Sequence, residues 1–297
     1  MSNVIVFQGE IGAYSHLACQ QFYPDMTPKP CASFADAFKA VQSGEAKLAM
    51  IPVENTVAGR VSDIYHLLPE GGLHIIGENY LPIHHQLLAV KGAKIGDIKT
   101  ARSHPMALGQ VRKRLTTLGI KPIVDTDTAG AARAVSELGD KSVAAIASTV
   151  AGETYELDVI AADIEDAAHN TTRFLILADE PLKIETDKGF VVTSFVFKVR
   201  SVPSALYKAL GGFANNGINM TKLESYMVGG SFSAAQFYAD VEAHPDDVAM
   251  KHALEELAFF TENVTILGTY PADPLRHRAS PRNRDLESSE KVPIYTV

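Results

Sequence analysis

Four short segments of the sequence carry side chains whose types and spacing suit the binding and transformation of a small anionic molecule. Each lies beside an apolar, strand-like run, and the ends of strands in open α/β sheets hold a disproportionate share of ligand-binding groups. The segments are Gly9–Ser15 (GEIGAYS), Glu54 with Asn55, 103–108 (SHPMAL) and 169–177 (HNTTRFLIL). Glycines and free amides at a strand-to-helix turn favour a carboxylate, so the first segment indicates an anion-binding turn.

Each of these segments also has a purely structural explanation. The glycine pair suits any strand-to-helix turn, and Glu54 could cap the helix that follows it. Ser103 could be a helix N-cap with Pro105 in the first turn, which leaves His104 unexplained. Arg173 could be an ordinary exposed side chain. Taken singly the segments leave function open, so their combination decides the interpretation.

The elements that would position these residues alternate between strands and helices over residues 1–180. Apolar runs are followed by helical patterns at 4–7 and 14–22, at 48–53 and 61–68, and at 143–147 and 148–155. This alternation predicts βαβ units around largely parallel sheets, whose ligands bind at the carboxyl ends of the strands. We expect 75–90 to carry the chain to a second sub-lobe and 170–180 to return it.

After Pro181 the pattern predicts a strand–helix–strand–strand–helix–strand order. The expected elements are strand 190–200, helix 201–217, strand 218–225, a turn at Gly229 and Gly230, strand 232–241, helix 246–257 and strand 264–270. This βαββαβ order is typical of a ferredoxin-like unit, here over 190–272. The stretch 273–297 is polar and aperiodic, so a flexible tail is expected.

Composition restricts the class of protein. The chain has 297 residues, 46% of them hydrophobic, which is enough for two domains with buried cores. Its formal charge of -8 argues against a general nucleic-acid surface. Cys19 and Cys31 form no CxxC pair, and no apolar run approaches the length of a membrane span. We expect a cytoplasmic protein whose partners include neither nucleic acid nor membrane.

Together the segments resemble the prephenate dehydratase family. The motifs that carry the resemblance are Gly9–Ser15, 51–63 (IPVENTVAGRVSD), 103–111 (SHPMALGQV) and 170–177 (NTTRFLIL). Residues 204–227 (SALYKALGGFANNGINMTKLESYM) are similar to the ACT regulatory domain of these enzymes. The resemblance implies an α/β fold in which a two-lobed, periplasmic-binding-protein-like catalytic domain over 1–181 precedes an ACT domain over 190–272.

The resemblance implies a lyase that converts prephenate to phenylpyruvate, with release of carbon dioxide and water, without cofactor or metal. Thr172 is expected to donate a hydrogen bond to the leaving hydroxyl. A hydroxyl is too weak an acid to supply the proton alone, so a neutral Glu54 or a protonated His104 is the expected source. Arg173 is expected to anchor a substrate carboxylate, since its planar fork binds both oxygens. Asn55 completes the expected catalytic set.

Further positions are expected to contact the substrate or a regulatory ligand. The expected substrate-binding residues are Ser15, Ser103, Thr171 and Phe174. The positions that match the effector pocket of the family are Leu206, Asn216, Gly217, Ile218, Asn219, Glu224 and Ser225. The implied effector is L-phenylalanine, which such domains bind between paired subunits, so a homodimer or homotetramer is expected.

The sequence departs from the family pattern at two places. Met106 stands where the family often has Gln, and Tyr226 with Met227 stand where the regulatory motif commonly reads Arg-Pro. Two alternatives remain: the same chemistry on the aminated substrate arogenate, and a non-catalytic protein that binds and senses an amino acid. We expect no fused chorismate mutase segment, because the chain starts directly on the first expected strand.

Overall fold

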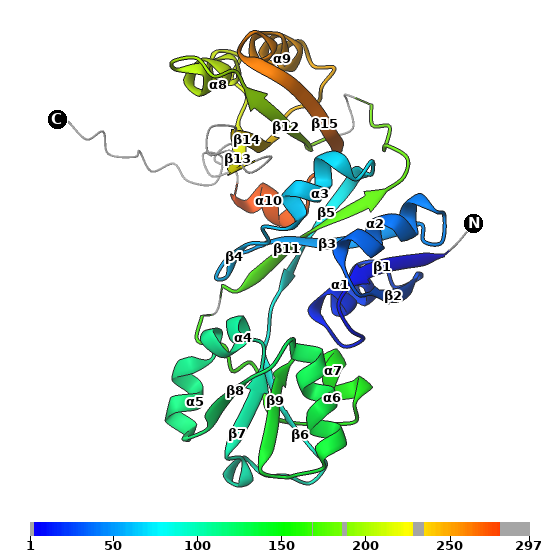
Figure 1. Cartoon of the computed structure of the whole chain (residues 1–297), viewed down its shortest axis with the longest axis vertical. Helices are drawn as coiled ribbons and strands as arrows, with labels where there is room; N and C mark the ends of the chain where they lie inside the picture. Colours follow the sequence, from blue (N-terminus) through cyan, green and yellow to red (C-terminus); the bar gives the residue numbers. More distant parts are fainter. Residues whose placement is uncertain (1–2, 168, 186–188, 228–234, 280–297) are drawn as a thin grey trace, which may run out of the picture.

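The computed structural model describes residues 3–167, 169–185, 189–227 and 235–279. Its three sheets follow one another along the long axis, with the second lobe at one end, the first lobe in the middle and the C-terminal sheet at the other end (Figure 1). A two-lobed, periplasmic-binding-protein-like α/β part followed by a βαββαβ part confirms the predicted fold class. No helix of the described residues is long and apolar enough to cross a membrane.

The first lobe is built on a six-stranded sheet with the order β2-β1-β3-β11-β5, and β4 pairs with β3. Its elements are β1 (Val4–Gln8), α1 (Tyr14–Phe22), β2 (Thr27–Cys31), α2 (Phe34–Gln42), β3 (Leu48–Asn55), β4 (Gly59–Arg60), α3 (Ile64–Glu70), β5 (His74–Pro82) and β11 (Thr171–Ala178). The strands β1, β2 and β3 are parallel, as predicted, whereas β11 runs antiparallel to β3 and β5 because it returns from the second lobe.

The second lobe has a five-stranded sheet with the order β10-β6-β9-β7-β8. Its elements are β6 (Gln86–Ala89), the 3-10 helix η1 (Ile95–Asp97), β7 (Thr100–Ser103), α4 (Pro105–Gln110), α5 (Arg112–Leu118), β8 (Lys121–Val124), α6 (Thr128–Leu138), β9 (Val143–Ala147), α7 (Thr149–Thr154) and β10 (Asp158–Ala161). Two extended crossings join the lobes, one between β5 and β6 and one between β10 and β11 (Figure 1).

The C-terminal part forms a four-stranded antiparallel sheet with the order β13-β14-β12-β15. Its elements are β12 (Val191–Val199), α8 (Ala205–Asn215), β13 (Met220–Met227), β14 (Ala235–Val241), α9 (Val248–Phe260) and β15 (Thr261–Pro271), followed by α10 (Pro274–Ala279). Helix α8 begins later than expected because Ser204 has a φ of 62°, which no helical residue adopts. The expected turn at Gly229 and Gly230 lies outside the described residues.

One face of the C-terminal sheet packs on the first lobe, and helices α8 and α9 cover its other face. Residues Leu175 and Leu177 of β11 share one buried cluster with Val196 of β12 and Tyr270 of β15. The first lobe and the C-terminal sheet therefore share a hydrophobic core. Because such a core is close-packed, a displacement of one part shifts side chains of the other.

The prediction of a flexible tail is wrong for its first residues. Residues 274–279 form α10, and Arg276 is buried against the first lobe. Its Nε donates to Glu78 Oε1 at 2.7 Å, a contact that the polar, aperiodic sequence gives no sign of. The rest of the expected tail, 280–297, lies outside the described residues.

We expect Gly268→Ala to lower the free energy of unfolding by about 1–3 kcal/mol, the usual cost of overpacking. A Cβ added at Gly268 would lie 2.0 Å from the carbonyl oxygen of Ile75, so β15 and β5 would have to separate. Urea unfolding measures the change. Gly211→Ala in α8 is the matched control, because its Cβ meets open space and alanine favours helices. Equal stability of Gly268→Ala and the parent would contradict this close contact.

Candidate active site

A pocket of about 410 Å³ lies between the two lobes, where the carboxyl ends of β1, β3, β7 and β8 face one another. Strand ends of this kind are where open α/β sheets bind ligands. Its lining includes Tyr14, Ser15, Asn55, Thr172 and Phe174 from the first lobe, and His104, Met106, Gln110 and Asp127 from the second. Ser15, Asn55, His104, Thr172 and Phe174, all expected in a site, therefore come together in one pocket.

Asn55 holds the Thr172 hydroxyl. Its Nδ2 donates to Thr172 Oγ1 at 2.9 Å and to Asn170 Oδ1 at 2.8 Å. Its Oδ1 accepts from the backbone amides of Val57 and Ala58 at 2.9 and 2.7 Å, which fixes the orientation of the side-chain amide. Because Thr172 Oγ1 accepts from Asn55, the Thr172 hydroxyl proton is left to donate to a ligand.

A chain of hydrogen bonds continues from Asn170 across the floor of the pocket. Asn170 Nδ2 donates to Gln110 Oε1 at 3.1 Å, and His85 Nε2 lies 2.6 Å from the same oxygen. Since that oxygen accepts, His85 carries its proton on Nε2, and its Nδ1 accepts from Tyr14 Oη at 2.6 Å. Sequence reasoning missed Asn170, Gln110, His85 and Tyr14, because partners so distant in the chain leave no local pattern.

Burial sets the ionisation of the two titratable members of this chain. It lowers the pKa of His85, and it raises the pKa of Tyr14 well above its ordinary value, with the nearby Glu165 adding to the rise. Both side chains are therefore neutral at pH 7. The chain of hydrogen bonds braces the two lobes without placing a charge in the pocket.

Arg173 lies on the opposite face of the first-lobe sheet from the pocket. Its side chain is 1% exposed, and its Nη1 lies 2.7 Å from Asp240 Oδ2 and 3.2 Å from Glu54 Oε1. The structure thus corrects the expectation that Arg173 anchors a substrate carboxylate in the cleft. The cause is the alternation of side chains along β11, which sends Thr172 and Phe174 to the pocket and Arg173 to the other face.

Glu54 also faces away from the pocket. In the ladder between β3 and β11, Arg173 pairs with Glu54 and Phe174 with Pro52, so Val53 is an extra residue that makes a β-bulge. The bulge turns Asn55 into the pocket and Glu54 out of it. Burial alone would raise the pKa of Glu54, but Arg173 and Lys222 outweigh burial and lower it. The expectation of a neutral Glu54 as proton donor is therefore corrected.

Two expected substrate contacts are made with the protein instead. Ser103 is fully buried and its Oγ donates to the carbonyl of Ile146 at 2.6 Å. The Thr171 backbone amide donates to Thr56 Oγ1 at 2.9 Å, and alternation places the Thr171 side chain on the face of Arg173. Within the described part of the chain, both lie outside the pocket lining, so their expected roles are corrected.

His104 and the first turn of α1 are the groups best placed to meet an anion. His104 caps α4, and its Nδ1 accepts from the Met106 amide at 3.2 Å, so its Nε2 carries the proton. Ala13, the N-cap of α1, makes no side-chain cap, which leaves amides of the first turn to a ligand. No Lys or Arg among the described residues lines the pocket.

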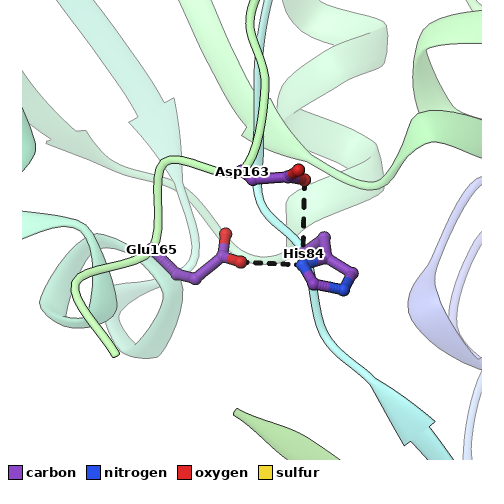
Figure 2. Close-up of side chains that lie close together, drawn as sticks. All are labelled: His84, Asp163 and Glu165. Carbon is purple, nitrogen blue, oxygen red and sulfur yellow. Dashed lines mark hydrogen bonds and ion pairs between the residues drawn. The ribbon is translucent and has the colours of Figure 1, made fainter. Parts of the chain in front are cut away.

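A cluster at the crossings contains the types of side chain that bind metals. His84 Nδ1 lies 2.8 Å from Glu165 Oε1 and 3.7 Å from Asp163 Oδ1 (Figure 2). Glu165 Oε2 also accepts from the His85 amide at 2.9 Å. These direct contacts join the two crossings, which explains the cluster without a metal.

The expected effector residues lie at two places on the C-terminal part. Leu206 and Ile218 are partly buried in the core beneath α8 and α9, and Asn216 caps α8 by donating to the Gly212 carbonyl at 2.8 Å. Gly217 has a φ of 67°, and Asn219 Nδ2 donates to Glu242 Oε2 at 2.8 Å. Glu224 and Ser225 lie on edge strand β13, where Glu224 Oε2 and the Ser225 carbonyl accept from Arg60 Nη1 at 3.1 and 3.0 Å.

The family model described as prephenate dehydratase matches residues 5–182, and the chain belongs to this family. A bifunctional N-acyl-homoserine lactone acylase/prephenate dehydratase of Komagataeibacter europaeus is 49% identical over 93% of this chain and 98% of its own length. Arogenate dehydratase/prephenate dehydratase 1 of Arabidopsis thaliana is 42% identical over 92% of this chain and 73% of its own length. Membership makes the chain a lyase of the dehydratase type.

Two solved structures are similar to this chain over most of its length. One, described as a novel type of quorum-quenching acylase, superposes with a TM-score of 0.87 at 49% identity and covers 92% of this chain and 99% of its own. The other, the prephenate dehydratase of Arthrobacter aurescens in complex with L-Phe, has a TM-score of 0.83 at 27% identity and covers 96% of this chain and 100% of its own.

The buried, neutral state of His85 makes stability depend on pH. The folded pKa is lowered, so this contribution is complete above the unfolded value of about 6.5 and is lost as the pH falls towards the folded value. We expect the urea midpoint to fall between pH 7.5 and 5.5, and to fall less steeply in His85→Gln. His252→Gln, on the surface of α9, is the control. The same slope in His85→Gln and the parent would contradict this explanation.

Proposed function

We propose that the chain is a prephenate dehydratase, which converts prephenate to phenylpyruvate during the biosynthesis of L-phenylalanine. The observation that carries the proposal is the Thr172 hydroxyl in the pocket, which accepts from Asn55 and keeps its proton for a ligand. In this reaction the electrons of the bond to the ring carboxylate move into the ring, carbon dioxide leaves, and the ring hydroxyl departs as water. A donor beside that hydroxyl is what the step requires.

Thr172 donates to the departing hydroxyl, and His104 supplies the second donor through Nε2. This atom carries the proton because Nδ1 is occupied by the Met106 amide. Of the two proton sources that the sequence left open, only His104 lines the pocket, and its neutral ring there offers a hydrogen bond rather than a proton. The proton that leaves with the hydroxyl comes from solvent at the pocket mouth, and the Thr172 hydroxyl takes up one proton as it gives up another.

The pocket holds a dianion without a cationic side chain. The open first turn of α1 supplies amides for one carboxylate, and the helix dipole favours negative charge at that end. Part of the lining is an apolar wall that includes Ile83 and Phe174. A ring carboxylate against this wall is less solvated than in water, which favours loss of carbon dioxide.

Removal of the Thr172 hydroxyl tests the proposal. We expect Thr172→Ala to lower kcat for prephenate by about 10²- to 10⁴-fold with a much smaller change in KM, since the hydroxyl acts on the departing group. Thr172→Ser retains a hydroxyl and is the matched control, with activity closer to that of the parent. An active Thr172→Ala would contradict the role of the Thr172 hydroxyl. A parent that binds prephenate without forming phenylpyruvate would contradict the assignment and favour a non-catalytic amino-acid sensor.

Arogenate is the second candidate substrate, because Asp127 places a carboxylate in the pocket lining. Arogenate carries an ammonium group where prephenate has a ketone, and a carboxylate favours the ammonium. The side chain of Asp127 also caps α6, accepting from the Gly130 amide at 2.7 Å. Arabidopsis and Petunia relatives at 37 to 42% identity are named arogenate dehydratases, which supports a comparison of the two substrates.

We expect Asp127→Asn to lower kcat/KM for arogenate by about tenfold relative to prephenate if arogenate is the physiological substrate. Asparagine is an equally good N-cap, so the variant changes the charge of the pocket without removing the cap. Turnover of both substrates by parent and variant measures the preference. An unchanged ratio of the two kcat/KM values would show that Asp127 does not set the substrate preference.

Hydrolysis of an N-acyl-homoserine lactone is a further activity to assay, since the 49% identical relative carries that name. Met106 is 47% exposed and lines the pocket, where the family often has Gln, so the pocket offers an acyl chain an apolar surface. Release of free homoserine lactone by the parent is the decisive observation.

For regulation we propose feedback by L-phenylalanine in a homo-oligomer whose C-terminal parts pair. The βαββαβ topology supports this, because the sheet ends in the edge strands β13 and β15, which pairing with a second copy would cover. The Arthrobacter neighbour was solved in complex with L-Phe. Leu206, Asn216, Gly217, Ile218 and Asn219, with Glu224 and Ser225, remain the proposed effector positions; Thr172, Asn55, His104, Ser15 and Phe174 remain the proposed catalytic and substrate-binding set.

A further inference from the structure

A largely buried cluster of charged side chains lies where the first lobe meets the C-terminal part, and the proposed reaction uses none of them. Three carboxylates and three cations form it, so their formal charges cancel. The members are Glu54, Glu78 and Arg173 from the first lobe, and Lys222, Asp240 and Arg276 from the C-terminal part. Buried charges are held only where partners and hydrogen bonds replace water, so the loss of one partner leaves another charge uncompensated.

Arg173 is the centre of this cluster. Its Nε contacts Glu78 Oε2 at 2.8 Å, its Nη1 contacts Asp240 Oδ2 at 2.7 Å and Glu54 Oε1 at 3.2 Å, and its Nη2 contacts Tyr270 Oη at 3.0 Å. A guanidinium has five N–H donors, and these contacts use four. Arg173 therefore joins β3, β5 and β11 of the first lobe to β14 and β15 of the C-terminal sheet.

Asp240 is the matching centre on the C-terminal side. Its Oδ1 accepts from Ser194 Oγ at 2.5 Å, and its Oδ2 also lies 3.3 Å from Arg276 Nη2. Burial would raise the pKa of Asp240, but Arg173 and Arg276 outweigh burial and lower it, so the carboxyl is ionised. Asp240 thus holds Arg173 from a fixed position in β14.

The cluster lies directly behind the pocket. In the ladder between β11 and β3, Thr172 pairs with Asn55 and the next pair is Arg173 with Glu54. Thr172 and Asn55 face the pocket, while Arg173 and Glu54 reach into the cluster. A shift of the Arg173 backbone therefore moves the Thr172 hydroxyl, because the two residues share one peptide unit.

We propose that Arg173 is a positioning residue of the dehydratase site, which acts through Thr172 and Asn55 and is held in place by Asp240 of the C-terminal part. This inference rests on the proposed function for its kinetic consequence. Its structural consequence is independent of substrate: the catalytic strand keeps its place only while the C-terminal sheet stays docked. A ligand that displaces β14 or β15 when it binds would therefore move Thr172 in the pocket through Asp240 and Arg173.

The test replaces Asp240 with asparagine in the full chain. We expect Asp240→Asn to lower kcat for prephenate by about 10- to 100-fold, the usual effect of a misplaced catalytic group, with KM changed by less than about threefold. Hydrogen–deuterium exchange is expected to rise in peptides that cover 169–178. Arg173→Gln combined with Asp240→Asn is expected to cost no more than the worse single variant, since the two side chains act as one unit.

Asp246→Asn, which removes an exposed carboxylate from the same part of the chain, is the matched control and is expected to leave both readouts at parent values. If Asp240→Asn does not fold, Tyr270→Phe removes only the hydroxyl at Arg173 Nη2, and the same pattern is expected with a smaller amplitude. Parent-like kcat together with parent-like exchange in 169–178 would overturn the inference. A parent without turnover would refute the proposed function alone, because the exchange readout still decides the role of Arg173.

Discussion

The structure depends on strand β11, whose two faces have different roles. Strand β11 presents Thr172 to the pocket and Arg173 to a buried cluster of ions, and it pairs with β3, which does the same with Asn55 and Glu54. The pocket needs a hydroxyl whose oxygen already accepts a hydrogen bond. The cluster needs a cation able to bind several carboxylates, which arginine alone supplies with a planar fork. The short Thr-Arg-Phe motif therefore combines a chemical group with the anchor that holds it.

The absence of a cationic side chain in the described pocket lining has a chemical consequence. A fixed guanidinium beside the ring carboxylate would stabilise the group that must leave, whereas backbone amides at the start of α1 bind one carboxylate locally and leave the apolar wall free. Asn55, Asn170, Gln110, His85 and Tyr14 add a neutral brace across both lobes. Charge is concentrated on the other side of the sheet, where the first lobe meets the C-terminal part.

The sequence predicted the fold and most residues of the site. It predicted less well the direction in which their side chains point. Strand and helix order, the βαββαβ unit and the grouping of Thr172 with Asn55 follow from periodicity and motif. Alternation alone already forbids Thr172 and Arg173 from facing one pocket, so that error was avoidable. The bulge at Val53, which turns Glu54 away, has no signature in the sequence. Helix α10 was missed because Arg276 is ordered by Glu78, a partner 198 residues away.

The most direct test is a crystal structure of the full chain with phenylpyruvate bound, since the product keeps the aromatic ring and the pyruvyl group in the pocket. We expect the ligand between the lobes, with a donor contact from Thr172 Oγ1, its carboxylate at the first turn of α1, and the guanidinium of Arg173 still bound to Asp240 and Glu78. A product carboxylate held by Arg173, with the contact to Asp240 broken, would contradict the division of the strand into two working faces.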